Sequence, residues 1–461
     1  MFRNSRIIKY IIIGVLLLSV FSCNPIQTEK EVFLEDLKLR TFRFFWENFD
    51  EPTGQFPDRF PNRYFTSIAA TGFGLTSYII GVENQYISRE EAAKRTEKTL
   101  NWLWNSKQGP DSAGTSGYNG FYYHFLTYGD GVRFKNVELS TIDTGWLLAG
   151  ILACQSYFTG KTATEQNIRL LADSLYLRVN WNWAMEGQGT MSMGWHPERG
   201  FIPARYDGYS EAMMVYLLGL GSPSFPIPDS AWNSWCSTYK WREFKGFEFL
   251  NFSPLFGHQY SHMFIDFRGI FDPYMSEKGI DYFENSRRAT LSNRQYCIDN
   301  PGNFESYGEN IWGLTACDGP ADIWEADTMR FRTYWARGAS ALETRDDGTI
   351  APTAAGGSIP FAPEECINAL FTMKNTFGDS LYQEYGFKDA FNMTYLHPGS
   401  NQKGWFDHDY LGIDQGAILI QLENYQSQLI WNIMKNNKYI INGLKKAGFR
   451  NGWIENVNFA P

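Results

Sequence analysis

The chain has 461 residues, of which 43% are hydrophobic and 17% aromatic. This composition excludes disorder over most of the length, because disordered chains are poor in aromatic residues. A chain of this length can bury a large core without disulfides or metals. Its formal net charge of −9 argues against a protein that binds the phosphates of nucleic acids, which requires a basic surface.

The chain begins with the pattern of a secretory signal. Basic residues precede the apolar run 10–21, which is too short to span a bilayer but has the length of a signal-peptide apolar region. The run is followed by Ser22 and Cys23, and the segment Val-Phe-Ser-Cys resembles a bacterial lipobox. We therefore expect residues 1–22 to be removed, Cys23 to be lipidated and residues 23–30 to form a tether. The alternative is an ordinary secretory signal, in which Cys23 would have no role of its own.

Lipidation would place the protein in the bacterial cell envelope, anchored to a membrane through Cys23. The tether lacks a dense acidic run that could mark export to the outer surface, so we expect a periplasmic location. No later stretch of the sequence is long and apolar enough for a transmembrane helix.

Six cysteines occur, and five remain if Cys23 carries lipid. Five cysteines cannot all pair within one chain, and their wide spacing matches neither a disulfide framework nor a zinc motif. We expect most of them to be buried apolar thiols. The sequence leaves a Cys297–Cys317 bridge open.

Helical patterns recur after residue 30, with few strand signals. Within 162–180, for example, Ile168, Leu171 and Leu175 share one face of the predicted helix. Ser88 stands before two acidic residues that suit the first turn of a helix. The predicted helices are 31–48, 66–81, 89–106, 141–158, 162–180, 210–220, 228–240, 258–268, 276–297, 361–377, 414–434 and 436–446.

Long loops rich in glycine, proline and aromatic residues separate these helices, and loops of this length usually carry function. Paired helices with elaborate loops at one end predict an all-α fold of the (α/α)6 barrel type. No shift in composition marks a boundary, so we predict one domain over residues 31–461, with a two-domain all-α protein as the alternative. The loops are 107–136, 182–209, 299–319, 344–360 and 386–413.

The sequence contains none of the common nucleotide or serine-hydrolase motifs: no P-loop, no GxGxxG after a strand and no GxSxG. His258, His262 and Asp266 are spaced by four residues and would share one face of a helix. Gln259 takes the place of the glutamate of a zinc-binding HExxH motif. We therefore expect these residues to line a pocket, and we expect no metal and no cofactor.

Three acidic residues stand at the starts of predicted apolar helices. Small residues around Asp143 leave it accessible at the entrance of its helix, Glu211 lies in the first turn of the next, and Asp414 opens the helix 414–434. Each could simply cap its helix. In a toroid of helical pairs, however, three acids at the same helix ends would converge, and paired carboxyl groups are the means of glycosidic-bond cleavage.

The aromatic loops favour a sugar ligand, because pyranose rings stack on aromatic side chains and their hydroxyls bind polar partners. Tyr206, Trp312 and Trp405 lie in or beside these loops, although some of the loop aromatics are expected in the core. Asp318 and Arg268 could bind sugar hydroxyls or form structural ion pairs.

Several segments resemble the glucoamylase-like domain family, and the resemblance runs from about residue 35 to 455. Residues 209–223, which read YSEAMMVYLLGLGSP, are similar to its YxEAM…YLLxLGSP segment. The other matching segments are 257–262, 266–269, 281–287, 312–320, 350–355, 387–392 and 413–416.

This resemblance implies an (α/α)6 barrel and an activity. Among the family's secreted members, the chain resembles lipoproteins of glycoside hydrolase family 144, of the Bacteroidetes type. They imply an anomer-inverting hydrolase of β-1,2-glucan that releases short oligosaccharides such as sophorose. A transglycosylase on the same polymer is a neighbouring alternative. A non-catalytic glycan-binding lipoprotein is the alternative from a different class, and it would not need converging acids.

Matching the family's motifs places its acids on Glu211, Asp414 and Asp143. We expect Glu211 to be the general acid, Asp414 the general base, and Asp143 to assist or to hold the sugar. Burial or a neighbouring carboxylate would have to keep the proton on Glu211. The residues expected to contact the substrate are Tyr206, His258, Tyr260, His262, Arg268, Arg288, Trp312, Asp318 and Trp405.

Overall fold

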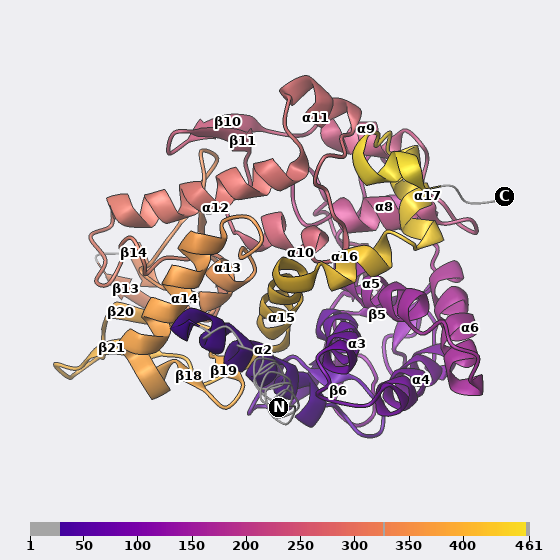
Figure 1. The fold of residues 1–461 in the computed structure, drawn as a ribbon, viewed down its shortest axis with the longest axis horizontal. Coiled ribbons are helices and arrows are strands. Elements are labelled where there is room, and N and C mark those ends of the chain that lie inside the picture. Colours follow the sequence, from indigo (N-terminus) through magenta and orange to yellow (C-terminus); the bar gives the residue numbers. More distant parts are fainter. Residues whose placement is uncertain (1–27, 326–327, 458–461) are drawn as a thin grey trace, which may run out of the picture.

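The computed structural model describes residues 28–325 and 328–457 (Figure 1). Helices dominate the fold, as the sequence predicts. The α-helices are α2 (Glu29–Glu47), α3 (Ile68–Glu83), α4 (Arg89–Asn105), α5 (Thr141–Tyr157), α6 (Ala163–Leu177), α7 (Trp181–Met185), α8 (Met213–Gly221), α9 (Ala231–Cys236), α10 (Phe256–Phe264), α11 (Pro273–Lys278), α12 (Tyr282–Asp299), α13 (Pro352–Gly356), α14 (Pro363–Phe377), α15 (Gly412–Ser427), α16 (Leu429–Met434) and α17 (Lys438–Lys446), with 3₁₀ helices η1 (Gly378–Ser380) and η2 (Gly452–Asn456).

Short strands, which the sequence analysis did not predict, lie between the helices. They are β1 (Phe56–Pro57), β2 (Arg59–Phe60), β3 (Phe65–Ser67), β4 (Gly117–Tyr118), β5 (Phe121–Tyr123), β6 (Phe125–Thr127), β7 (Leu139–Ser140), β8 (Gly194–His196), β9 (Gly200–Phe201), β10 (Trp241–Phe244), β11 (Phe247–Leu250), β12 (Ala316–Cys317), β13 (Ile323–Glu325), β14 (Thr328–Phe331), β15 (Trp335–Ala336), β16 (Gly338–Ala339), β17 (Thr344–Arg345), β18 (Tyr382–Gln383), β19 (Gly386–Phe387), β20 (Phe391–Leu396), β21 (Lys403–Phe406) and β22 (Tyr410–Leu411).

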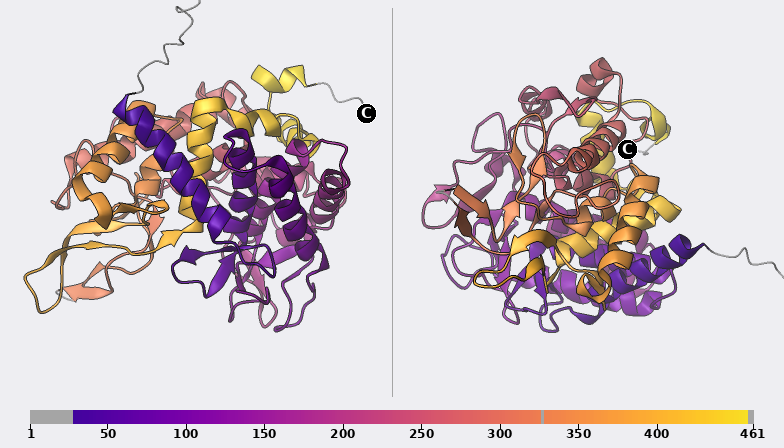
Figure 2. Two further views of the ribbon diagram at one scale, coloured as in Figure 1. Left: turned by 60° about the horizontal axis from the view of Figure 1, so that its bottom comes forward. Right: turned by 90° about the vertical axis from the view of Figure 1, so that its left-hand side faces the viewer.

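These strands form small antiparallel sheets rather than a core sheet. The largest has the order β4-β5-β7-β8-β9, a second has the order β1-β3-β6, and the others contain two strands each. Strands β3, β7 and β22 lead directly into α3, α5 and α15. The sheets therefore lie at the N-terminal ends of these helices, and Figure 2 shows the strands gathered along the lower side of its left view.

Helices α3, α5 and α15 approach one another closely. Gly72 of α3 faces the carbonyl group of Trp146 in α5, and Gly150 of α5 faces the carbonyl group of Gly72. A methyl group at either glycine would collide with the opposite backbone, so only glycine permits this contact. At the start of α15, Gly412 packs against Ala70 near the start of α3.

The far ends of the same helices also meet. The amide of Asn84, which follows α3, donates a 3.0 Å hydrogen bond to Glu423 near the end of α15. The hydroxyl of Tyr157, at the end of α5, donates a 2.6 Å hydrogen bond to Glu83 at the end of α3. The three helices therefore run in the same direction, with their N-terminal ends together. In Figure 1, α3, α10 and α15 lie toward the middle of the molecule, and α4, α6, α12 and α14 lie toward its outside.

Two large clusters of buried apolar side chains make up the core, and helices α2 and α15 contribute to both. Phe42 of α2 and Leu419 of α15 belong to the first cluster, whereas Phe33 and Ile418 of the same helices belong to the second. Trp312, predicted to contact sugar, is fully buried in the second cluster. Trp312 is therefore one of the loop aromatic residues that were expected to belong to the core.

Most predicted helices occur, but several boundaries were wrong. The predicted helix 276–297 is two helices, because Gly279 adopts a left-handed conformation (φ 71°) that ends α11. The predicted helix 414–434 is likewise broken at Gln428 (φ 59°). Thr28 already caps α2, which begins inside the predicted tether. Ser88 caps α4 with a reciprocal bond from Glu91, as its sequence context indicated.

The expectation of buried thiols is confirmed for the five cysteines of the described residues, which are all free and buried. The Cys297–Cys317 bridge that the sequence left open is therefore absent. Within residues 28–325 and 328–457, no helix has both the length and the apolar character needed to cross a bilayer. The predicted signal peptide and Cys23 lie outside the described residues, and the extent of the domain stays a prediction.

Candidate active site

A cavity of about 140 Å³ lies among the N-terminal ends of α3, α5, α10 and α15 and the segment that precedes α8. It has a mostly apolar and aromatic wall interrupted by two carboxyl groups and one imidazole. Asp414 comes directly after Ile413, the residue of α15 that lines the cavity. The residues lining the cavity are Ala69, His124, Ile142, Asp143, Trp146, Glu211, Phe256, Tyr260, Ala316, Tyr334 and Ile413.

Asp143 belongs to the first turn of α5. Its backbone N–H donates a 3.2 Å hydrogen bond to the hydroxyl of Ser140, the N-cap residue, and that hydroxyl donates to the Asp143 carboxylate. Ser140, and not Asp143, is therefore the cap of α5. Burial raises the pKa of Asp143, and the positive charge of His124 acts against this rise.

His124 joins Asp143 to a second carboxylate. It lies between β5 and β6, where its Nδ1 donates a 2.7 Å hydrogen bond to Glu138 Oε1, and its Nε2 lies 3.6 Å from Asp143 Oδ2. Burial disfavours the imidazolium, but the carboxylates of Asp143 and Glu138 outweigh it and raise the pKa of His124 to about 9. Burial also disfavours an ionised Glu138, yet the hydrogen bond and charge of His124 lower the pKa of Glu138 to about 2. At neutral pH, His124 is therefore charged.

Glu211 lies two residues before α8, so the predicted helix 210–220 starts later than expected. Its carboxyl group faces the cavity, and its Oε2 is buried and accepts no hydrogen bond from the described residues. Burial, with a smaller contribution from the charge of Asp143, raises the pKa of Glu211 to about 7. A carboxyl group with this pKa can hold a proton near neutral pH and release it to a leaving group.

Asp414 is the third residue of α15 and is 3% exposed. It does not cap α15, whose N-cap is Leu411 and has no side-chain hydrogen bond. Burial raises the pKa of Asp414 to about 7, while a hydrogen bond from Asp389 acts in the opposite direction. Burial and the negative charge of Asp414 in turn raise the pKa of Asp389 well above its ordinary value. One proton shared between these two carboxyl groups accounts for both directions.

Arg59 neutralises part of the acidic surroundings of Asp414. Its guanidinium donates a 2.7 Å hydrogen bond to Asp318 and a 3.2 Å hydrogen bond to Asp58, and it lies 3.4 Å from Asp409. Strand β2, which carries Arg59, pairs with β22 immediately before α15. Asp318, predicted to bind sugar, is thus held next to Asp414 by an ion pair.

The family model described as "Putative glucoamylase" (Glycoamylase) matches residues 203–438, a region that includes Glu211 and Asp414. The chain belongs to this family. The solved structure of a "putative glucoamylase" from Bacteroides uniformis is 33% identical, with a TM-score of 0.80 over 93% of this chain and 99% of that chain.

Two further proteins, each named for an activity on β-1,2-linked glucose chains, are similar to this glycoamylase-family chain. An exo β-1,2-glucooligosaccharide sophorohydrolase from Parabacteroides distasonis is 28% identical over 451 residues, which cover 90% of this chain and 58% of that protein. The chain thus spans little more than half the length of this curated relative. An endo-β-1,2-glucanase from Chitinophaga pinensis, solved with sophorotriose and glucose, is 26% identical. Its TM-score is 0.80 over 93% of this chain and 100% of that chain.

Two predicted aromatic contacts of the glycoamylase-family chain lie at the cavity or close to it. Tyr260 of α10 lines it directly. Tyr206 is buried near Glu211 and Asp143, whose charges add to the effect of burial in raising its pKa. Both tyrosines therefore belong to the surroundings of the acids.

The predicted histidine cluster forms a buried part of α10 rather than the cavity wall. His258 Nε2 donates a 3.2 Å hydrogen bond to the carbonyl group of Phe252, and His262 Nε2 lies 3.0 Å from the hydroxyl of Ser286. Burial lowers the pKa of His258 to about 4 and that of His262 to about 3, so both are neutral at pH 7. Helix α10 ends at Phe264, so Asp266 does not share its face as predicted.

Three other predicted sugar contacts lie apart from the cavity. Arg268 pairs with Asp266 at 2.7 Å, and Arg288 pairs with Glu284 at 2.9 Å. Trp405 of β21 lines a separate surface groove. Both arginines form ion pairs within the fold, which is the alternative that the sequence left open for Arg268.

Sequence reasoning missed His124, Trp146, Phe256 and Tyr334, which all line the cavity. Tyr334 is 53% exposed, so it stands at the rim and offers a ring to an incoming ligand. His124 had no motif to reveal it, because its partner Asp143 is 19 positions away in the chain. His124 reaches α5 because β5, which precedes His124, pairs with β7, which leads into α5.

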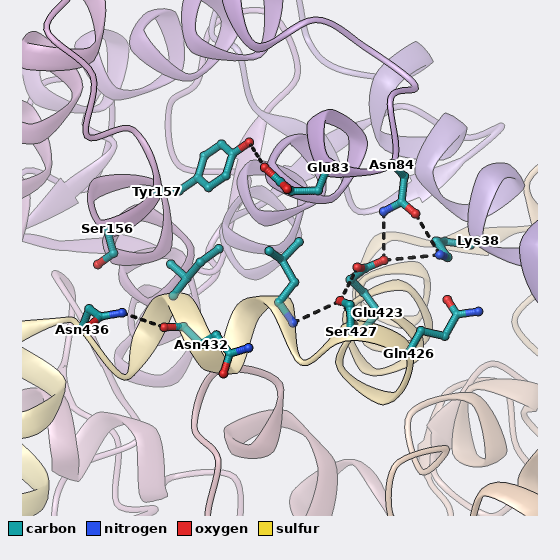
Figure 3. Close-up of a pocket in the computed structure, with 12 residues that line it drawn as sticks. Lys38, Glu83, Asn84, Ser156, Tyr157, Glu423, Gln426, Ser427, Asn432 and Asn436 are labelled. Atoms are coloured by element: carbon teal, nitrogen blue, oxygen red, sulfur yellow. Dashed lines mark hydrogen bonds and ion pairs between the residues drawn. The ribbon is translucent and has the colours of Figure 1, made fainter. Parts of the chain in front are cut away.

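A larger groove, of about 520 Å³, lies at the opposite ends of α3, α5 and α15 (Figure 3). Lys38 Nζ there lies 3.5 Å from Glu423 and donates a 2.9 Å hydrogen bond to Asn84. Ser427 donates a 2.5 Å hydrogen bond to Glu423. The buried acid of this groove, Glu423, is therefore fully paired, and the other acid, the exposed Glu83, accepts the hydrogen bond of Tyr157.

Proposed function

We propose that this protein is an anomer-inverting glycoside hydrolase that cleaves β-1,2-glucan and releases short oligosaccharides such as sophorose. One observation supports this proposal most strongly: Glu211, with a pKa raised to about 7, and Asp143 share an aromatic-walled cavity next to Asp414. The relatives that cleave β-1,2-linked glucose chains support the choice of substrate.

In the proposed reaction, Glu211 donates its proton to the glycosidic oxygen as the bond to the anomeric carbon breaks. A water molecule attacks that carbon from the opposite face and gives a proton to Asp414, the general base. The hydroxyl group is thus added with inversion, and a β-linkage yields an α-configured reducing sugar. This reaction consumes one water and requires no cofactor.

The charged His124 gives Asp143 a separate role. Because His124 lies between Glu138 and Asp143, its positive charge favours an ionised Asp143. An ionised Asp143 beside Glu211 makes loss of the Glu211 proton harder, and it can accept hydrogen bonds from sugar hydroxyls or stabilise positive charge at the reacting ring. We assign His124 as a positioning residue for Asp143.

An (α/α)6 barrel is the architecture we propose around this cavity, with α3, α5, α8, α10, α13 and α15 as its inner helices. The common direction of α3, α5 and α15 and the position of their N-terminal ends support it. A crystal structure in which these six helices do not close into one ring would contradict it.

The decisive test of activity is incubation with linear β-1,2-glucan and, separately, with starch. We expect new reducing ends from β-1,2-glucan alone, and proton NMR of the first products should show the α-anomer. Sugar release from starch but not from β-1,2-glucan would overturn the proposed substrate. Longer products without new reducing ends would indicate a transglycosylase, and binding without turnover would indicate a glycan-binding protein.

A lipid anchor at Cys23, facing the periplasm, is part of the same proposal and rests on the lipobox-like sequence alone. Metabolic labelling with a radioactive fatty acid should mark the wild-type protein and leave Cys23→Ser unlabelled. Protease added to intact cells should spare the wild-type protein if it faces the periplasm. Labelling of both forms would exclude Cys23 as the site.

A further inference from the structure

Three carboxylates from separate loops converge beside α15. Asp318 follows β12, Asp389 follows β19, and Asp407 follows β21. Each of them offers one carboxylate oxygen, and these three oxygens lie within 4.8 Å of one another. Backbone hydrogen bonds fasten the loops together, since Asp389 N–H donates to the carbonyl of Asp409 at 3.0 Å and Asp407 N–H donates to the carbonyl of Ala390 at 2.9 Å.

Each of the three carboxylates is already oriented through one of its oxygens. Asp389 Oδ2 accepts the N–H of Asp318 at 2.7 Å, and Asp318 Oδ2 accepts Arg59 Nη1 at 2.7 Å. Asp407 Oδ1 accepts the N–H groups of His408 and Asp409 at 2.6 and 3.1 Å. These hydrogen bonds hold the acids in place and leave the second oxygen of each without a backbone or cationic donor.

One of the second oxygens is buried without any donor: Asp407 is 4% exposed, and its Oδ2 accepts no hydrogen bond from the described residues. Asp389 is 1% exposed, and its Oδ1 has no donor among the described residues beyond the one proton that Asp389 and Asp414 share. A buried carboxylate oxygen without a partner is costly, so such groups usually bind a proton, a donor or a metal ion. This observation is independent of the closeness of the three acids.

The surrounding charges leave the cluster strongly negative. Asp58, Asp409 and Asp414 add three further carboxylates. The cations near the cluster are Arg59, Lys388 and Arg337. The charge of Asp407 acts on Lys388, and the guanidinium of Arg337 pairs with Asp347. Arg59 is already shared among Asp58, Asp318 and Asp409.

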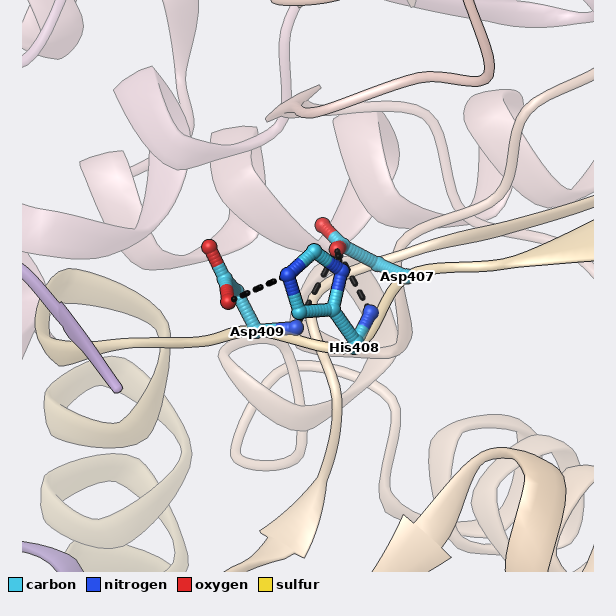
Figure 4. Close-up of side chains that lie close together, drawn as sticks. All are labelled: Asp407, His408 and Asp409. Carbon is cyan, nitrogen blue, oxygen red and sulfur yellow. Dashed lines mark hydrogen bonds and ion pairs between the residues drawn. The ribbon is translucent and has the colours of Figure 1, made fainter. Parts of the chain in front are cut away.

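His408 belongs to the outer edge of the cluster. Its ring lies between Asp407 and Asp409, with ring nitrogens 3.5 and 3.2 Å from their oxygens (Figure 4). The side chain is 73% exposed, so water screens its charge. It therefore does not supply the charge that the buried oxygens lack.

We propose that Asp318, Asp389 and Asp407 bind one calcium ion, with water completing its coordination. An all-oxygen set selects a hard cation rather than zinc or copper. Calcium accepts about six to eight oxygen ligands in flexible geometry, which suits carboxylates from three separate loops, whereas magnesium demands near-ideal octahedral geometry. The ion would tie together the three loops at the N-terminal end of α15. The sequence analysis expected no metal, because these acids are far apart in the chain and form no motif.

Calorimetric titration of the purified full-length chain, stripped with EDTA and dialysed, tests this site. We expect one Ca²⁺ per chain and weaker binding of Mg²⁺. At a Ca²⁺ concentration about 100-fold above Kd, Tm should rise by about 3–5 °C. Asp389→Asn and Asp407→Asn should each abolish both effects, and the exposed Asp111→Asn serves as the control.

Terbium provides a second measurement that does not depend on thermal stability. We expect Tb³⁺ bound to the folded wild-type chain to luminesce when tryptophan is excited, and Ca²⁺ to displace it. Folded Asp407→Asn should give no such signal. Absence of Ca²⁺ binding by the wild-type chain at 10 mM, or equal binding by both Asn variants, would overturn the proposal and leave protons as the counter-charge. The outcome does not depend on hydrolase activity, because every readout is binding.

Discussion

The two ends of α3, α5 and α15 carry the same kind of polar group in opposite states. At the C-terminal ends, Glu423 is 3% exposed and receives Lys38, Asn84 and Ser427 as partners. At the N-terminal ends, Asp414 is equally buried, but its partner is a second acid, Asp389, and its Oδ2 has no donor among the described residues. One end of the bundle is neutralised and the other is left unsatisfied.

This difference shows where the molecule can do chemistry. A buried acid with all its partners stabilises the fold but has no capacity left for a ligand. A buried acid without partners costs stability, and it persists where a ligand or a reaction uses it. The larger groove is thus structural, and the smaller cavity is the candidate active site.

The largest expected effect is the loss of turnover when the unsatisfied end loses its proton donor. Glu211→Gln should lower kcat on β-1,2-glucan by ~10²–10⁴-fold, because glutamine cannot protonate the leaving oxygen. A reducing-end assay measures the change, and circular dichroism checks the fold. Glu90→Gln, at an exposed ion pair with Lys94, is the matched control. A variant within tenfold of wild type would make Asp143 the first candidate for the acid.

At the neutralised end, removing one partner should affect stability and leave kcat unchanged. Lys38→Met would leave Glu423 buried without its cation, at a cost of ~3–5 kcal/mol in the free energy of unfolding. Urea denaturation measures this change. Lys94→Met removes a comparable pair that is solvent-exposed, so its cost should stay below ~1 kcal/mol. Equal effects of the two variants would contradict the contrast between the two ends.

The pH dependence of stability should reveal the cost of ionising the buried Glu211. Its folded-state pKa of about 7 lies above the ordinary 4.5, so its contribution to stability is fully present below pH 4.5 and is lost as the pH rises through 7. Glu211→Gln avoids burying a charge. Urea denaturation across this range should therefore show the variant gaining about 1–3 kcal/mol over wild type as the pH increases. A constant difference would show that Glu211 has an ordinary pKa.

His124 can be tested through the acidic limb of the pH profile. His124→Gln removes the charge that lowers the pKa of Asp143, so Asp143 should protonate at a higher pH. Because the base Asp414, with a pKa of about 7, already sets the start of the acidic limb of kcat/KM, protonation of Asp143 should add a second ionisation that steepens this limb and lowers it by about tenfold one pH unit further into acid.

The control for this variant is His397→Gln, since His397 Nε2 bonds the carbonyl of Gly404 on a distant hairpin. An NMR titration of the His124 ring gives a reading without substrate: its pKa should fall from about 9 in Glu138→Gln. The other charged groups facing His124 are Asp143 and Asp58. An acidic limb that keeps its slope would reduce His124 to a structural residue.

The smallest effect is expected at the rim of the cavity. Tyr334→Ala should raise KM by ~3–10-fold and leave kcat nearly unchanged, because a stacking ring stabilises bound sugar and transition state alike. Stability should not change, since Tyr334 is 53% exposed. Tyr425→Ala, at another exposed tyrosine, should leave KM unaltered. A larger loss in kcat than in binding would place Tyr334 closer to the reacting atoms than we infer.

The helices could be predicted from the sequence because their signals are local, and the meeting of Asp143 with Glu211 because both stand at helix starts that the expected toroid brings together. Period-3.6 apolar faces and caps such as Ser88 mark helices within one or two turns. The breaks at Gly279 and Gln428 were missed, because a single left-handed residue leaves the apolar pattern on both sides intact. The catalytic roles of the acids stay predictions.

Contacts between residues that neither a motif nor a helix start marks could not be predicted. Strands of two or three residues are too short to show alternation, so neither β5 nor β7 was found, and His124 with them. Trp312 had the same sequence context as a sugar-binding aromatic but is buried in the core. Asp318, Asp389 and Asp407 come from three loops whose packing no local pattern records.

The contact of α3 with α5 at Gly72 and Gly150 has a consequence for mutational tolerance. Backbone, rather than side chains, sets the spacing of these two helices, so substitutions on their outward faces leave the distance between their ends unchanged. Alanine at either glycine would push the helices apart and displace Asp143 from its neighbours while much of the core stayed packed. Selection for activity would therefore reject variants at these two positions that selection for solubility alone would accept.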